Sequence, residues 1–250
     1  MRRRIVLLAP VLAVAQAAPL RVGIGVGEVG SAFWAVPGPR GVTVDLARAL
    51  AQAWGRPLEL VSFASSSEVT DAVAGGTVEV AFMPTDPVRA ARVAFGPDFY
   101  LFTSTLLVLP GRALASQAEA TAAAGLRIVG VRGTTTLRSA ERAFPAASFL
   151  VVTGQDEALA ALREGRAEAV ALGRESLESL LPRFPGASIL PGHFHASGTA
   201  IAVPPGRPQA LAAATAWMEA AKADGTVRRA LDAHGLSGPV APPGSRTGAP

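Results

Sequence analysis

Arg89 is the residue whose type and position most clearly call for a chemical partner. The sequence Asp-Pro-Val-Arg at 86–89 follows a predicted strand and has the residue types of a helix start. Asp86 is predicted to cap the helix and Pro87 to be its first residue, so Arg89 falls in the first turn, where the helix dipole disfavours a cation. An anion would offset this, either a neighbouring acid or a ligand carboxylate held by two parallel hydrogen bonds. Thr85, directly before the cap, is a further candidate contact.

A second candidate site follows another predicted strand, at Arg132-Gly133-Thr134-Thr135. Gly133 allows a close approach of the backbone, and the two threonines place hydroxyls at the start of a helix. Helix N-termini of this kind bind carboxylates and phosphates, although capping alone also selects threonine. Arg89 and Thr135 follow equivalent strands and could face each other across one cleft.

The glycine pattern at 25–30 resembles a dinucleotide-binding loop but lacks its context. Gly25, Gly27 and Gly30 satisfy G-x-G-x-x-G after a strand, and Asp45 follows at a suitable distance. That loop needs a helix to begin at once, so that its N-terminus faces the pyrophosphate. Here a Pro- and Gly-rich stretch follows, and Asp45 lies inside the next predicted helix. We therefore expect no nucleotide site.

The sequence gives little support for catalysis or metal binding. It contains no cysteine, and it lacks the motifs of serine hydrolases, zinc proteases and P-loop NTPases. His193 and His195 are two residues apart and could share a strand face as metal ligands, but no third ligand accompanies them. We expect no catalytic residue, no metal and no cofactor.

Short apolar runs alternate with amphipathic segments along the chain, which predicts mostly parallel sheets covered by helices. The alternation restarts near residue 126, so two α/β lobes are expected. Ligands of such sheets lie beyond the carboxyl ends of the strands, where both candidate sites fall. The predicted strands are 20–24, 58–63, 78–83, 126–131, 148–152, 168–172 and 200–203, and the predicted helices 44–51, 65–74, 135–144, 156–164, 175–184, 209–223 and 226–234.

The first residues have the three-part pattern of a secretory signal peptide. Arg2, Arg3 and Arg4 precede an apolar run to Ala15, and small residues follow, which predicts cleavage after Ala17. The run is shorter than the about 20 residues that span a bilayer. Without cysteine there is no lipid-attachment site and no disulfide. The mature protein is expected to be free in the periplasm.

Charge excludes a nucleic-acid role. The whole chain has 23 basic and 19 acidic residues, and without the three leader arginines 20 basic residues remain against 19 acidic ones. Such a balance lacks the excess of positive charge that binds the phosphate backbone of a nucleic acid.

Several motifs in sequence order carry a family resemblance over about residues 20–236. The chain resembles the bacterial extracellular solute-binding proteins of family 3, and in particular periplasmic receptors of polar amino-acid transporters. The resemblance implies a type II periplasmic-binding fold, with each lobe a mostly parallel sheet flanked by helices. It also implies that Arg89 holds an α-carboxylate with help from Thr135. The motifs are Gly-Val-Thr-Val-Asp-Leu-Ala at 41–47, Val-Glu-Val-Ala at 78–81, Asp-Pro-Val-Arg at 86–89, Val-Ala-Phe-Gly-Pro-Asp-Phe-Tyr at 93–100, Gly-Val-Arg-Gly-Thr-Thr at 130–135 and Ala-Asp-Gly-Thr at 223–226.

The resemblance also implies a division of the chain. Two hinge strands connect the lobes, and the chain leaves the first lobe near Leu101 and returns near Gly198. The expected segments are a signal peptide at 1–17, the first lobe at 18–101 and 198–236, the second lobe at 102–197, and a disordered tail at 237–250. The tail is assigned from its Pro- and Gly-rich composition.

Two departures from the family pattern bear on the ligand. The aromatic residue that stacks on the ligand has no clear match, and Phe33 or Trp34 is the candidate substitute, with loop packing as the alternative. The acid that pairs with an α-ammonium is replaced by Gly173, which is flanked by Arg174. We therefore expect a carboxylate ligand without an α-ammonium, against the alternative of an amino acid held through Glu28 or Glu175.

The sequence thus predicts a monomeric solute-binding protein that captures a small carboxylate-bearing solute by lobe closure and delivers it to a membrane ABC permease. One alternative is an enzyme on the same scaffold, similar to periplasmic cyclohexadienyl dehydratases, in which Glu28 or Glu175 would transfer a proton. Another is a ligand-sensing partner of a membrane receptor.

Overall fold

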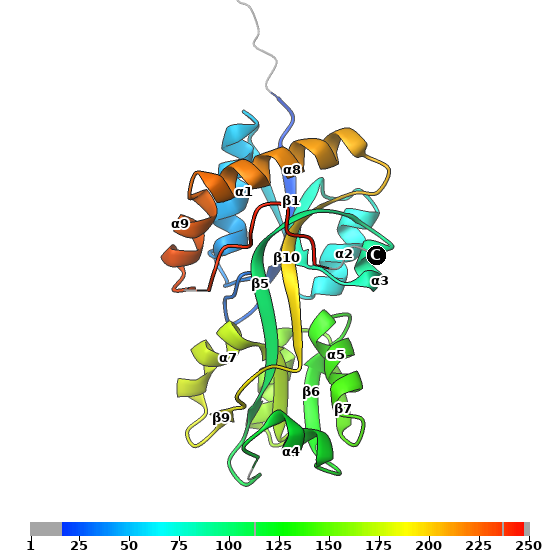
Figure 1. Cartoon of the computed structure of the whole chain (residues 1–250), viewed down its shortest axis with the longest axis vertical. Coiled ribbons are helices and arrows are strands. Elements are labelled where there is room, and N and C mark those ends of the chain that lie inside the picture. Colours follow the sequence, from blue (N-terminus) through cyan, green and yellow to red (C-terminus); the bar gives the residue numbers. More distant parts are fainter. Residues whose placement is uncertain (1–16, 113, 237, 248–250) are drawn as a thin grey trace, which may run out of the picture.

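The computed structural model describes residues 17–112, 114–236 and 238–247, which form two lobes joined by two long strands (Figure 1). The predicted signal peptide lies outside the described residues except for Ala17. Among the described residues, no helix has the length and apolar character needed to cross a membrane.

The first lobe, at the top of Figure 1, contains both chain ends of the described part. Its helices begin where the sequence supplies a cap, as at Ser65, whose hydroxyl accepts a hydrogen bond from the Glu68 amide at 3.2 Å. Its elements are β1 (Leu20–Val26), β2 (Trp34–Ala35), α1 (Val42–Ala53), β3 (Leu58–Phe63), α2 (Ser66–Ala74), β4 (Val80–Pro84), α3 (Pro87–Ala90), α8 (Pro208–Ala223) and α9 (Thr226–Ala233).

The second lobe repeats the alternation of strands and helices. β6 lies between β7 and β8 and is parallel to both, as expected for strands joined by crossover helices. The elements are α4 (Gln117–Ala122), β6 (Arg127–Val131), α5 (Thr135–Ala143), β7 (Ser148–Val152), α6 (Gln155–Arg163), β8 (Ala169–Gly173), α7 (Arg174–Leu180), a short 3-10 turn (Leu181–Arg183) and β9 (Ser188–Ile189).

Two antiparallel strands, β5 (Ala94–Val108) and β10 (His195–Val203), run from one lobe into the other. β10 pairs with β4 in the first lobe, and β5 pairs with β8 in the second. One sheet therefore runs through both lobes in the order β2-β1-β4-β10-β5-β8-β6-β7 over the described residues. Leu101 and Gly198 are register partners in this pair of strands.

Each lobe buries apolar side chains on both faces of its part of the sheet. In the first lobe, Leu50 of α1 and Met218 of α8 pack on one face, and Val69 of α2 packs on the other. In the second lobe, Leu159 of α6 and Phe144, which follows α5, belong to separate clusters. This arrangement confirms the predicted α/β fold with two lobes of helix-covered, mostly parallel sheet.

The segment 238–247 differs from the disordered tail that its composition predicts. Val240 forms a β-bridge with Tyr100, and the Ala241 amide donates to the Phe99 carbonyl at 3.0 Å. Asp98, whose side chain is fully buried, accepts hydrogen bonds from the Thr247 amide and hydroxyl at 2.6 and 2.9 Å. Hydrogen bonds to β5 hold this segment, and the Pro- and Gly-rich composition on which the prediction rested does not reveal them.

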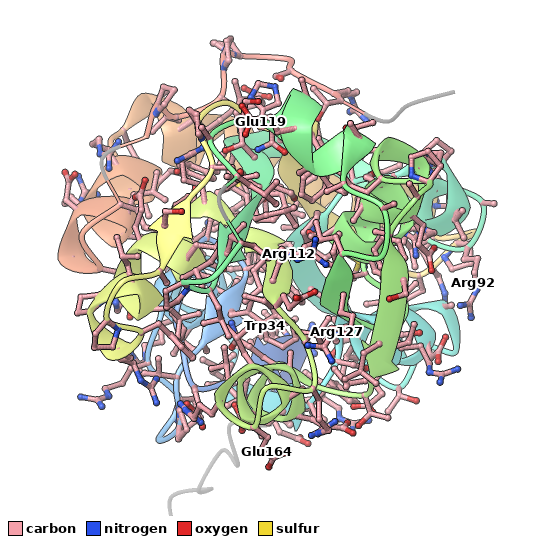
Figure 2. The ribbon with its side chains drawn as sticks, turned by 90° about the horizontal axis from the view of Figure 1, so that it is seen from below. Trp34, Arg92, Arg112, Glu119, Arg127 and Glu164 are labelled. Carbon is pink, nitrogen blue, oxygen red and sulfur yellow. The ribbon has the colours of Figure 1, made fainter. Side chains whose placement is uncertain are left out.

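The outer surface of the second lobe carries charged side chains in pairs. Viewed from that end, Arg112 and Arg127 lie close together and Glu164 lies at the edge, while Arg92, at another edge of the view, belongs to the first lobe (Figure 2). Glu168 pairs with Arg112 at 3.0 Å and with Arg127 at 3.6 Å. Partly exposed pairs of this kind add little stability.

Candidate ligand-binding site

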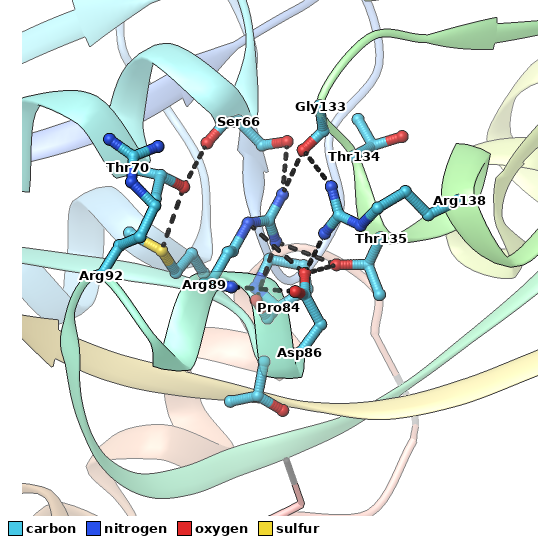
Figure 3. Close-up of polar contacts among 12 residues, drawn as sticks. Ser66, Thr70, Pro84, Asp86, Arg89, Arg92, Gly133, Thr134, Thr135 and Arg138 are labelled. Atoms are coloured by element: carbon cyan, nitrogen blue, oxygen red, sulfur yellow. Dashed lines mark hydrogen bonds and ion pairs between the residues drawn. The ribbon is translucent and has the colours of Figure 1, made fainter. Parts of the chain in front are cut away.

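Arg89 lies in α3, the short helix that follows β4, and faces the second lobe (Figure 3). The predicted cap is confirmed, because Asp86 Oδ1 accepts a hydrogen bond from the Arg89 amide at 3.0 Å and Pro87 is the first helical residue. Only 3% of Arg89 is exposed. The cap thus directs the guanidinium into the space between the lobes.

The Arg89 guanidinium is held by both lobes. From the first lobe, the Pro84 carbonyl accepts from Nη1 at 2.8 Å and the Ser66 hydroxyl accepts from Nη2 at 2.8 Å. From the second lobe, Thr135 Oγ1 accepts from Nη1 at 3.0 Å and the Gly133 carbonyl accepts from Nη2 at 3.0 Å. The four N–H groups at the tip of the guanidinium therefore all have protein partners in this conformation.

Asp86 supplies the counter-ion. Its Oδ2 lies 3.7 Å from Arg89 Nε, accepts from Thr135 Oγ1 at 2.8 Å, and also accepts from Arg138 of α5. Burial alone would raise the pKa of Asp86, but the Arg89 charge and these hydrogen bonds keep it below its usual value. Burial lowers the pKa of Arg89 to about 10, so the arginine stays protonated at neutral pH. The sequence allowed two anionic partners for Arg89, a neighbouring acid or a ligand carboxylate. The neighbouring acid is present, and it is Asp86.

The loop before α5 brings the second lobe against the first. Gly133 has a left-handed φ of 70°, and a Cβ there would lie 2.4 Å from the Ser67 side chain, so only glycine fits. Thr134 caps α5, since its hydroxyl accepts from the Leu137 amide at 3.0 Å. Thr135, the next residue, therefore reaches Arg89 and Asp86.

Little space remains around Arg89. A cavity of about 30 Å³ lies there, and a water molecule needs roughly 10–15 Å³ of such space. Side chains of both lobes therefore fill most of the space around Arg89. The cavity is lined by Phe33, Trp34, Ser66, Pro84, Arg89, Phe102, Val131, Thr134, Thr135, Thr136, Leu172 and Gly173.

Gly173 is covered by an aromatic ring. A Cβ at Gly173 would lie 2.3 Å from Cε2 of Phe102, so the ring occupies the place of any side chain at this position. Phe33 and Trp34 close another side of the cavity, with ring centroids 4.9 Å apart in an edge-to-face arrangement. Both candidate aromatics thus border the cavity beside Arg89.

The model of the bacterial extracellular solute-binding proteins, family 3, matches residues 25–236. The chain belongs to this family. No curated protein sequence gave a significant match.

Solved structures of solute-binding proteins share the fold. The solute receptor for L-cysteine of Neisseria gonorrhoeae is 21% identical with a TM-score of 0.77, and the match covers 87% of this chain and 90% of the receptor. A Salmonella typhimurium periplasmic binding protein with high arginine specificity is 17% identical with a TM-score of 0.76, covering 87% and 99%. An ancestral amino acid-binding protein, described as a precursor of cyclohexadienyl dehydratase, is 21% identical with a TM-score of 0.73, covering 86% and 95%.

Three other predicted site residues of this solute-binding protein lie outside the cavity around Arg89. The Thr85 hydroxyl donates to the Gly198 carbonyl at 3.1 Å on the hinge. Arg132 is exposed, and Arg174 donates to the Leu190 carbonyl at 3.2 Å in its own lobe. Sequence position placed all three near strand ends, but none of them lines the cavity around Arg89.

Glu28 links the lobes of the solute-binding protein at their edge. Its carboxylate pairs with Arg163 at 3.1 Å and Arg183 at 2.7 Å, both from the second lobe. The Arg163 hydrogen bond is the largest influence and lowers the pKa of Glu28, although burial acts in the opposite direction. The Glu28 amide also donates to Asp156 at 2.9 Å. This acid is engaged in closure and does not line the cavity.

Glu175 lines a larger cavity of about 770 Å³, which is also bordered by both lobes. The Tyr100 hydroxyl donates to Glu175 Oε1 at 2.7 Å. Burial raises the pKa of the Glu175 carboxyl. Glu175 Oε2 is buried and has no hydrogen-bond partner among the described residues.

Three residues of the closed site were missed in the sequence: Ser66, Phe102 and Arg138. Ser66 begins a helix after β3, so the pattern that identified Thr135 would have identified it too. Phe102 and Arg138 gave no signal, because each meets its partner, Gly173 or Asp86, only through contacts between elements distant in sequence. Within the described part of the chain, no group of three or more acidic or histidine side chains is placed to hold a metal.

Proposed function

We propose that this chain captures a small carboxylate-bearing solute between its lobes and passes it to an ABC importer. The supporting observation is that Arg89 donates to Gly133 and Thr135 across the lobes. When the lobes part, these N–H groups lose their acceptors while the arginine stays anchored by Pro84 and Ser66. A carboxylate is the natural replacement, because it accepts two parallel hydrogen bonds from a guanidinium.

The proposed mechanism is hinge closure about β5 and β10. The lobes would be residues 18–101 with 198–236, and residues 102–197, since Leu101 and Gly198 face each other where both strands cross. A solute touching Arg89 from one lobe and the capped start of α5 from the other stabilises the closed form. The chain would act as a monomer, and the permease would recognise its closed form.

We further propose that the solute has no α-ammonium. Two structurally similar proteins are a receptor for L-cysteine and a binding protein with high arginine specificity. Here the position of the expected acid is Gly173, covered by the Phe102 ring. An ammonium placed there would be desolvated without a counter-ion, which costs several kcal/mol. Keto acids, aromatic acids and dicarboxylates avoid this cost.

A thermal-shift screen tests the proposed solute class. A ligand at a hundred times its dissociation constant adds about 2.7 kcal/mol of stability, enough to raise Tm by a few degrees. We expect organic acids without an α-ammonium to raise Tm and the standard amino acids to leave it unchanged. Stabilisation by amino acids alone would reject this solute class, and no stabilisation by any small carboxylate would reject the proposed function.

Export follows from the same proposal. Residues 1–17 would act as a cleaved signal peptide, and the mature chain would work in the periplasm. The family is described as extracellular, which agrees with this location.

A second candidate function is catalysis at Glu175. A buried carboxyl with a raised pKa, hydrogen-bonded to Tyr100 beside the 770 Å³ cavity, has the properties of a general acid. If the chain is such an enzyme, it should turn over prephenate, and Glu175→Gln should lower kcat at least about a hundredfold. If no turnover is detected even at high concentrations of the protein, solute binding remains the function.

A further inference from the structure

A third cavity, separate from the space around Arg89, lies between α3, α5 and the start of β10. Its volume is about 350 Å³. Pro87 and Val88 border it from the first lobe, Arg138 and Arg142 border it from α5, and Ser197 borders it from the hinge strand. Arg89 and Phe102, which line the closed cleft, do not reach it.

The charge around this cavity is positive. Arg138 and Arg142 both line it, whereas Asp86 is the one acidic residue among its lining side chains in the described part of the chain. Asp86 is already engaged by Arg89 and Arg138. Arg142 is exposed and donates to the Ser139 hydroxyl at 3.0 Å, with no ion pair among the described residues. One arginine is therefore left without an acidic counter-ion.

Two polar side chains of β10 line the cavity without partners. Ser197 is 8% exposed, and neither its hydroxyl nor His195 Nε2 has a hydrogen-bond partner among the described residues. The two residues are two apart on a strand, so their side chains share one face. Buried polar groups nearly always have partners, and an orphaned group often marks an absent ion or water.

The direction in which the pKa of His195 is shifted agrees with the positive charge around the cavity. Burial is the largest influence that lowers the pKa of His195, and the charges of Arg142, His193 and Arg138 lower it further, while Asp86 acts in the opposite direction. An anion in the cavity would offset this repulsion and give the ring a partner.

We propose that this cavity binds a small oxyanion, such as phosphate or sulfate, at a site distinct from that of the solute. Arg142 and Arg138 supply the charge, and the Ser197 hydroxyl and the His195 ring supply hydrogen bonds. Guanidinium groups match such anions with paired donors. Because both lobes and the hinge strand border the cavity, the bound anion would favour the closed form.

Inorganic phosphate is the probe, titrated by calorimetry and thermal shift against chloride at matched ionic strength. We expect saturable binding with a rise in Tm, and an affinity at least tenfold weaker in Arg142→Gln and in Ser197→Ala. Arg142 is exposed, so its replacement should leave the fold intact. Arg207→Gln, which removes an exposed charge outside the cavity, should bind phosphate as the wild type does.

Proton NMR of the histidine rings gives a second measurement. Of the three histidines, the resonance lost in His195→Gln should be the one that shifts on phosphate addition, and it should not shift in Arg142→Gln. Non-saturable stabilisation, or equal binding by wild type and Arg142→Gln, would overturn the proposal. The proposed oxyanion site does not depend on the identity of the solute, so this proposal can fail while the proposed solute binding holds.

Discussion

Arg89→Ala should lower the free energy of unfolding by about 3–5 kcal/mol, because it removes one member of a buried ion pair. Asp86 is 6% exposed and would keep Arg138 and Thr135 as partners, but not the charge of Arg89. The Ser66 hydroxyl would also lose its Arg89 donor, whereas the Gly133 carbonyl would keep a hydrogen bond from Arg138 at 3.1 Å. Urea denaturation, which reports the free energy of unfolding, measures the loss.

Arg92→Ala is the matched control for this prediction. Arg92 is three residues further on and pairs with Asp71 at 2.8 Å, but the two side chains are 47% and 57% exposed. Its replacement should change the free energy of unfolding by less than about 1 kcal/mol. If Arg89→Ala were no more destabilising than Arg92→Ala, the buried network would not hold the lobes.

Arg89→Lys separates stability from binding. Lysine keeps a positive charge near Asp86 but lacks the planar pair of donors that a carboxylate needs. We expect it to retain more stability than Arg89→Ala while the solute found in the screen binds at least about tenfold more weakly. Unchanged affinity in this variant would restrict Arg89 to a structural role.

Gly173→Asp should destabilise the protein by at least about 1–3 kcal/mol, the usual cost of inserting atoms into a packed site. A Cβ at this position would lie 2.3 Å from Cε2 of Phe102, and the new carboxylate would enter a buried region. Phe102→Ala removes the obstructing ring. The double variant should therefore be more stable than the sum of the two single changes, by about 0.5–3 kcal/mol in a double-mutant cycle.

The same double variant tests the proposed solute class. With an acid at 173 and no ring above it, amino acids should raise Tm where they leave the wild type unchanged. Phe102→Ala alone is the control, since it opens the space without adding a charge. Equal stabilisation of the control and the double variant by amino acids would show that the acid has no part in recognition.

The sequence determined the local structure because hydrophobic periodicity, caps and turn glycines act over a few residues. Most predicted strands and helices lie near their observed bounds, as for helix 209–223, observed at Pro208–Ala223. The long strand β5 and helix α4 were missed, and the last strand, predicted at 200–203, begins at His195. The cap at Asp86 and the start of α5 at Thr135 were also predicted correctly. With the ordered motifs, this alternation was sufficient for the two-lobed fold.

Only the tertiary structure decided how the site is used. Asp86 and Thr135 are 49 residues apart, and Asp86 and Arg138 are 52 apart, so no local pattern relates them. Thr85 and Arg174 lie at the expected strand ends, yet their side chains face other carbonyls. Side-chain direction, the ring over Gly173 and the hydrogen bonds of the segment 238–247 depend on packing between elements distant in sequence, and composition and spacing carry no record of such packing.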